Sequence, residues 1–348
     1  MKIFFIIIVG TLFLFTNANS ESFSIALSKA YKNNSELNAE RENVNISEQE
    51  LKISQADYLP TVTLSGSKSQ EDTDKLTNQS GGDASINDVN PSTKTISVSQ
   101  TLIDFGRGAE FSKNKIGLTL AKANLLKKEQ NILYKTTEAY TGLILANEKL
   151  EINKDNVELL NRQVETDRIR VERGQITLSD VAQSESSLAE AQAKLIQAEN
   201  ELLTSRLNYE NIIGSLNDIK SLDKKSINDY ELPESLVSAI EISKKNSPDL
   251  IIAQLEYEQA QKDEAIAKSD LAPTANLSFE RSYVEDFSAT YDEKEKDTIT
   301  ATISWPFYSG GKNIAALRKS KSLETRTRLI LDSVIKQNQT NVASAWSN

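Results

Sequence analysis

The chain has 348 residues, of which 26% are charged and only 6% aromatic, and its formal net charge is −10. Few aromatic residues are typical of long helices, and the acidic balance argues against a nucleic-acid partner, since phosphate binding needs a basic surface. The absence of cysteine and histidine excludes disulfides, Cys/His zinc sites and imidazole-based catalysis. We therefore expect no cofactor, no metal site and no catalytic residues, and an enzyme is the least expected class of function.

Residues 1–20 form a separate segment. Lys2 is followed by an apolar run from Ile3 to Phe15 and then by small and polar residues. This pattern predicts a secretory signal peptide. The alternative is an N-terminal membrane anchor, but the apolar run is shorter than the about 20 residues that a spanning helix needs. We expect an exported mature chain without a transmembrane helix.

The rest of the chain repeats itself. The segment Ala26–Pro60 resembles Ala239–Pro273 at a constant offset of 213 residues, and a second block that begins at Thr95 resembles one that begins at Thr300 at an offset of 205. The offset changes because the first copy holds a longer loop between the blocks. Repeats of this kind predict a duplicated structural unit.

The repeat also sets the expected domain boundaries. We expect a first repeat over 21–213, a polar connector over 214–232 and a second repeat over 233–348. At the 205 offset Asn348 corresponds to Leu143, so the second repeat is expected to be truncated. A natural chain end inside a helix is the alternative.

Each copy is expected to begin with helix and to continue as two strands. Residues 22–59 carry spaced apolar positions and predict helix, which Pro60 ends. Period-two alternation then predicts four strands, at about 61–70, 94–102, 274–283 and 297–305. The polar segments 70–93 and 285–297 are expected to be loops.

A coiled-coil hairpin is expected over about 109–213. Its first arm, uninterrupted to about residue 171, would be roughly 95 Å long. Apolar residues recur every seven positions from Leu143 to Val171 and again from Val181 to Tyr209, as in helices that pack knobs into holes. The short turn between the two runs predicts antiparallel packing. An ordinary amphipathic helix pair is the alternative, and it fits the period less well.

The predicted strands have one apolar face and one small-polar face. This suits a barrel with lipid outside and water inside, although strands of soluble sandwiches alternate in the same way. Four strands per chain are too few to close a membrane barrel, whereas three copies supply twelve. The expected fold class is α+β, mainly α, with long antiparallel coiled-coil helices joined to a trimeric 12-stranded barrel.

Paired motifs carry a family resemblance. Ser99–Arg107 and Ser304–Lys312 are similar to a strand-to-helix signature in two copies. Leu59-Pro60 and Ala272-Pro273 resemble a helix-to-strand signature, and Arg173–Val181 resembles the tip of a helical hairpin. Over essentially the whole mature chain, this set resembles the TolC family of outer-membrane efflux and secretion channels.

The resemblance implies a trimeric barrel continued by an α-helical barrel that extends into the periplasm. It implies a passive export duct of a tripartite efflux pump or type I secretion system, located in the outer membrane. The implied partners are two further copies of the chain, outer-membrane lipid, a periplasmic adaptor and an inner-membrane pump. The alternative is a soluble periplasmic coiled-coil adaptor or interaction protein.

Two sets of site residues follow. By the resemblance, the tip residues expected to contact the adaptor are Gly174, Thr177, Leu178, Asp180 and Val181. The alternative is that Gly174 only caps a helix and Asp180 only favours a helix start. The residues expected to face the membrane are Phe279, Ile299, Ala301, Ile303 and Trp305. Subunit packing is the alternative for this second set.

Overall fold

A computed structural model describes residues 22–348 except 73, 76, 78, 79, 84–87, 217, 225–231, 289 and 290. The predicted signal peptide lies outside the described residues. The chain divides into two units, one of residues up to Asn38 with Lys128–Glu231 and one of Ala39–Lys127 with Leu232–Asn348. Two helices, α2 (Ser35–Ala56) and α3 (Arg107–Glu172), contribute to both units.

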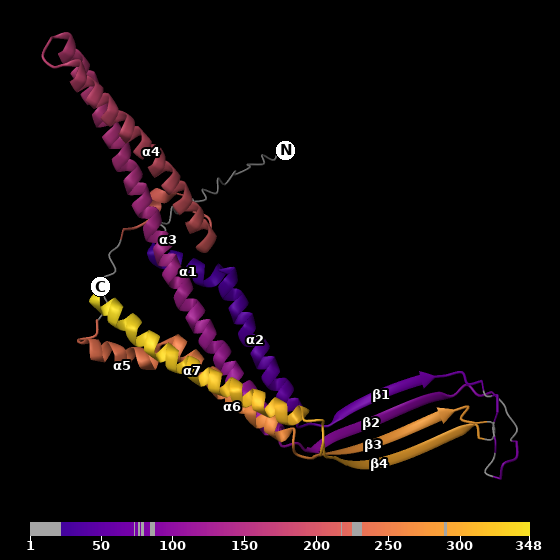
Figure 1. Cartoon of the computed structure of the whole chain (residues 1–348). Helices are drawn as coiled ribbons and strands as arrows, with labels where there is room; N and C mark the ends of the chain where they lie inside the picture. The colour runs from indigo at the N-terminus through magenta and orange to yellow at the C-terminus, as the bar shows by residue number, and fades with distance from the viewer. Residues whose placement is uncertain are drawn as a thin grey trace, which may run out of the picture. The chain divides into compact units, whose positions relative to one another are not determined.

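The first unit contains the predicted coiled-coil hairpin, formed by α3 and α4 (Leu178–Ile212) (Figure 1). The residues buried on facing sides of the two helices follow the heptad pattern: Leu143, Leu150, Val164, Val181, Ala191, Ala198 and Tyr209. Large residues beside alanines allow the helices to pack closely. Ion pairs of Lys149 with Glu201 at 2.6 Å and of Arg168 with Glu185 at 2.6 Å join the exposed edges. The coiled coil is thus confirmed.

An aromatic cluster lies at the end of this hairpin that is far from the turn between α3 and α4. The Phe23 ring of α1 (Phe23–Asn33) meets the Tyr140 ring edge-on at 5.3 Å, and Tyr140 lies 6.5 Å from Tyr209. The Tyr140 hydroxyl also donates to the Asp223 carbonyl oxygen and accepts from the Asp223 N–H. This attaches the connector, which includes a short 3₁₀ helix (η1, Ile219–Ser221), to α3.

The second unit contains a four-stranded antiparallel sheet in the order β1-β2-β3-β4 (Figure 1). The strands are β1 (Thr61–Lys68), β2 (Ser92–Ile103), β3 (Thr274–Glu285) and β4 (Glu293–Ser304). The central pairing of β2 with β3 joins the two copies of the repeat, with Val98 opposite Phe279. Strands β1 and β4 are therefore the two edges.

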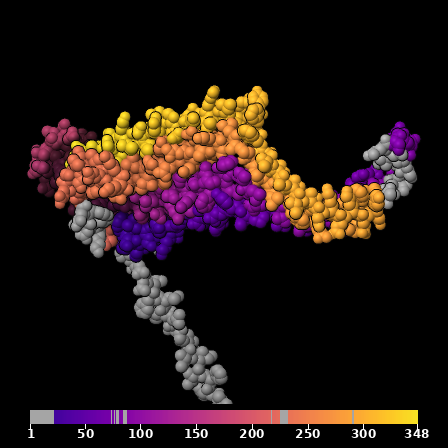
Figure 2. All heavy atoms as spheres, turned by 90° about the horizontal axis from the view of Figure 1, so that it is seen from below, coloured from indigo at the N-terminus to yellow at the C-terminus, as the bar shows by residue number. Residues whose placement is uncertain are grey.

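The helices show the duplication directly. Helices α5 (Leu236–Asn246) and α6 (Pro248–Ser269) begin and end 213 residues after α1 and α2, and α7 (Lys312–Ser347) begins 205 residues after α3. Within the second unit α6 and α7 lie side by side (Figures 1 and 2). The described chain has the mainly helical α+β class that the sequence predicted.

Two expectations about local structure are wrong. The predicted helix over 22–59 is two helices, because Asn34 leaves the helical conformation and its side-chain oxygen accepts from the Leu37 N–H to cap α2. The predicted loop over 285–297 is too long, because Glu285 belongs to β3 and β4 already begins at Glu293. The ladder of β3 and β4 continues to Glu285 opposite Glu293, because charged residues that pair across strands, such as Arg281 with Glu295, support strands without any apolar alternation.

The buried residues between α3 and α4, called the seam below, should dominate the stability of the hairpin. Leu143 is completely buried, whereas Leu145 on the same helix is 52% exposed. Leu143→Ala is expected to lower the free energy of unfolding by about 2–5 kcal/mol. Leu145→Ala is the matched control and should change it by less than about 0.5 kcal/mol. Urea unfolding of the purified protein, followed by far-ultraviolet circular dichroism, measures both, and equal effects would contradict the observed packing.

Candidate functional site: the hairpin tip and the strand faces

The tip of the hairpin is the turn that joins α3 to α4, and its first residues terminate α3. Gly174 has a φ of +69°, a left-handed conformation that favours glycine. Its N–H donates to the Val171 carbonyl oxygen at 2.8 Å, and the Gln175 N–H donates to that of Arg170 at 2.9 Å. These two bonds form a Schellman motif, which satisfies carbonyl groups at a helix C-terminus. The predicted capping role of Gly174 is confirmed.

The tip ends with a capping box at the start of α4. The Asp180 N–H donates to the Thr177 hydroxyl oxygen at 3.3 Å, and the Asp180 carboxylate accepts from the Thr177 N–H at 2.8 Å. The carboxylate also accepts from the Thr177 hydroxyl at 2.8 Å. These bonds, the backbone one foremost, hold the pKa of Asp180 below its usual value. The helix on each side of the turn is thus capped by hydrogen bonds, which hold the turn in one conformation.

The predicted tip residues divide into two groups. Gly174, Thr177 and Asp180 shape the turn, and Val181 is only 9% exposed because it begins the coiled-coil seam. Leu178, in contrast, is 78% exposed. An apolar side chain held in water by a rigid turn is available for a partner.

A residue that was not predicted lies in the seam near the tip. Asp167 is 5% exposed, and its Oδ2 atom accepts from the Ser184 hydroxyl at 2.6 Å and from the Gln163 amide at 2.8 Å. An Arg170 nitrogen lies 3.7 Å from Oδ1. These partners, Ser184 first, lower the pKa of Asp167. The sequence did hold a signal for this burial: Asp167 lies three residues after Val164, and that spacing places an acidic residue in the heptad core.

The stability of this region should depend on pH through Asp167. A carboxylate with a lowered pKa stabilises the folded state above its unfolded value of about 3.9, and that stabilisation is lost as pH falls through the folded value. Ser184→Ala should raise the folded pKa of Asp167. The variant should be less stable than the wild type near neutral pH, and the difference should shrink in acid.

Acid titration monitored by circular dichroism measures this effect, with Ser187→Ala as the control, because Ser187 bonds only a carbonyl oxygen of its own helix among the described contacts. A difference between Ser184→Ala and the wild type that is independent of pH would contradict the role given to Asp167.

The second candidate surface is the sheet. Residues opposite each other in an antiparallel ladder share a face, and one face carries the apolar residues Val62, Leu64, Ile96, Val98, Leu277, Phe279, Ile299, Ala301 and Ile303. The opposite face carries hydroxyl groups on all four strands, for example Thr63, Ser97, Thr300 and Thr302. In β4 the side chains of Ile299 and Ile303 are 75% and 77% exposed. The predicted membrane-facing residues of the strands therefore lie on one exposed apolar face.

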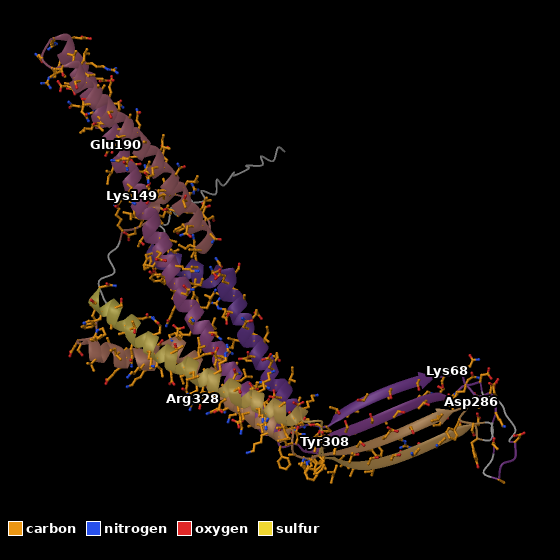
Figure 3. The ribbon with its side chains drawn as sticks, in the orientation of Figure 1. Lys68, Lys149, Glu190, Asp286, Tyr308 and Arg328 are labelled. Carbon is orange, nitrogen blue, oxygen red and sulfur yellow. The ribbon has the colours of Figure 1, made fainter. Side chains whose placement is uncertain are left out.

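The apolar face is bounded at both ends. Beyond Ile299 the same face continues with Asp297, which lies 3.7 Å from Arg281. Just past Ile303 lies Trp305, whose ring meets Phe307 edge-on at 5.7 Å. Figure 3 shows Tyr308 at the end of the sheet next to the helices of this unit and Lys68 and Asp286 at the opposite end. Asp297 and Trp305 are about 26 Å apart along the strand.

The strand-to-helix turn of the first copy is tightly built. The Asp104 carboxylate accepts from the Gly106 N–H at 2.8 Å, and a Cβ atom at Gly106 would lie 2.4 Å from the Ser269 hydroxyl oxygen. The Arg107 guanidinium donates to the Thr101 carbonyl oxygen at 3.0 Å. This packing explains why a Gly-Arg pair follows the strand.

The described helices include none that is long and apolar enough to cross a membrane.

Comparison with known proteins agrees with this geometry. The chain is 28% identical over 344 residues to the outer membrane efflux protein BepC of Brucella suis, covering 98% of this chain and 73% of BepC. It is 21% identical over 301 residues to the alkaline protease secretion protein AprF of Pseudomonas aeruginosa, covering 85% of this chain and 63% of AprF. The crystal structure of CusC superposes with a TM-score of 0.77 at 17% identity, covering 96% of this chain and 78% of CusC.

These matches support an outer-membrane efflux or secretion channel and do not support the soluble adaptor alternative. The model of the outer membrane efflux protein family matches residues 26–215, which is more than half of the chain. The chain therefore belongs to the outer membrane efflux protein family.

Proposed function

We propose that three copies of this chain form a passive, non-enzymatic export duct through the outer membrane. The observation that carries the proposal is the four-stranded sheet, which has two open edges and two chemically different faces. Backbone groups at an open edge cannot be left without partners in lipid. Pairing β4 of one copy with β1 of the next removes every edge and yields twelve strands, within the range of known membrane barrels.

In this arrangement the apolar face contacts lipid and the hydroxyl face lines the duct. The distance of about 26 Å between the Asp297 and Trp305 levels corresponds to about 20 Å along the membrane normal at the usual strand tilt, close to the apolar band of roughly 25 Å in such barrels. Trp305 suits the membrane–water interface, because its ring is apolar and its indole N–H, which donates to the Leu271 carbonyl oxygen, is polar. Phe279, Ile299, Ala301 and Ile303 are the lipid-facing residues between these limits.

Cysteine labelling tests both the trimer and the orientation of the faces. The complete protein in the outer membrane should run as a trimer in mild detergent. A charged maleimide should label Thr302→Cys, on the water-filled side, much faster than Ile303→Cys. Because the chain has no cysteine of its own, no background reaction is expected. Preferential labelling of position 303 would reverse the assignment, and a soluble periplasmic monomer would refute the proposed function.

We also propose that the hairpin tip recruits a periplasmic adaptor, which links the duct to an inner-membrane pump. The support is the exposure of Leu178 between two rigid caps. A preorganised turn loses little conformational freedom on binding, so an exposed leucine there contributes more affinity than one on a mobile loop. Gly174, Thr177 and Asp180 present Leu178, and Val181 anchors the turn in the seam.

Replacing Leu178 tests the recruitment. Leu178→Arg should abolish export and adaptor cross-linking, because it puts a charge into an apolar contact. Folding and trimer formation should persist, since the side chain makes little contact within the chain. Leu145→Arg, at another exposed leucine of the same helical pair, is the matched control and should export normally. Normal export and cross-linking by Leu178→Arg would leave the tip with only its capping role.

A further inference from the structure

The junction between the two repeats inside the chain is held by ion pairs as well as by the β2–β3 ladder. The Lys113 ammonium of α3 lies 2.8 Å from the Asp263 carboxylate of α6. A Cβ atom at Gly117, one turn further on, would lie 3.1 Å from the Gln259 side chain, so the two helices approach closely there. The ammonium of Lys113 and the carboxylate of Asp263 are both partly exposed.

The internal repeat predicts a second junction of the same kind. The 213 offset maps α6 onto α2 and therefore Asp263 onto Glu50, while the 205 offset maps the start of α3 onto α7 and therefore Lys113 onto Arg318. Both charges keep their sign. In a closed ring of identical copies, each β4–α7 edge must meet the β1–α2 edge of the next copy, which repeats the internal junction.

We propose that Glu50 of one copy and Arg318 of its neighbour form the ion pair that corresponds to Lys113–Asp263. This inference rests on the proposed trimer and names its contact. Both side chains are exposed, and neither has an ion pair or side-chain hydrogen bond within the described part of the chain. Helix α2 carries five acidic and two basic residues, whereas α7 carries seven basic and two acidic residues, so the net charges of the two helices are opposite.

Apolar side chains support the same contact. Ile46 and Ile53 of α2 flank Glu50 by one turn on each side and are 55% and 64% exposed. Ile314 of α7 precedes Arg318 by one turn and is 52% exposed. Residues three and four apart share a helix face, so each charge has an exposed isoleucine beside it that the neighbouring copy would cover.

The contact is limited to the part of the helices next to the sheet. The second internal ion pair, Lys127 with Asp249 at 2.6 Å, maps onto Asp332 and Glu36, which carry like charges. Glu36 instead pairs with Lys128 within the first unit, at 2.5 Å. The repeat thus predicts an attractive pair at Glu50 and Arg318 and none at the next corresponding position.

Cross-linking of the complete protein in the membrane tests the pair. The double variant Glu50→Cys with Arg318→Cys, treated with a short bismaleimide, should give covalent dimers and trimers on a denaturing gel. A bismaleimide is preferable to oxidation, because an ion pair of long side chains spans more than the 4.4–6.8 Å between Cα atoms that a disulfide tolerates. Glu50→Cys with Lys319→Cys is the matched control, since position 319 is turned about 100° around the helix, and it should cross-link far less.

Charge reversal supplies a second, independent measurement. Arg318→Glu and Glu50→Arg should each lower the temperature at which the trimer dissociates in detergent, and the double reversal should return it toward the wild-type value. If the wild type is a trimer but position 319 cross-links as well as 318, or the double reversal restores nothing, the ion pair is wrong and the trimer stands. A monomeric wild type would overturn the proposed function and this inference together.

Discussion

The open edges of the sheet constrain the rest of this molecule. Along one side of β1 and one side of β4, backbone N–H and C=O groups have no strand partner in the part of the chain that the structure describes, and a lipid environment supplies none. A chain with four strands whose apolar face is turned toward lipid must therefore complete its sheet with other chains. Most apolar side chains of the sheet lie on one face and most hydroxyl groups on the other, which is consistent with a wall that has water on one side and hydrocarbon on the other.

The internal duplication explains how the sheet could be completed with a single kind of junction. One helix-strand-strand-helix unit, used twice, needs only one kind of junction, and the chain shows that junction where β2 meets β3 and Lys113 meets Asp263. The proposed ring of copies would reuse the same geometry between chains. Exposed ion pairs contribute modestly to stability, so the main effect of the proposed pair of Glu50 and Arg318 would be to set which edges meet and in which register.

The hairpin combines rigidity with one exposed apolar residue. Its seam is packed with leucine, valine and alanine, and its turn is closed by a Schellman motif and a capping box. Asp167 is a charged residue buried in the seam. Asp167 accepts from Ser184 across the seam, besides its partners Gln163 and Arg170 on its own helix. This bond favours one alignment of the two helices, because a slip of α4 would remove the only one of these partners that α4 supplies.

The sequence by itself determined the class, the repeat, the heptad seam and the alternation of the strands, because each depends on local periodicity and on residue types at fixed spacing. It also identified Gly174 as a helix end. It did not separate α1 from α2 at Asn34, nor extend β3 and β4 through their charged residues, since a side-chain cap and cross-strand ion pairs depend on partners that periodicity does not encode. Only the tertiary structure decided that Val181 is buried and Leu178 exposed, and that Asp167 faces Ser184. Those outcomes follow from how two helices rotate against each other, and a single helix period does not specify that rotation.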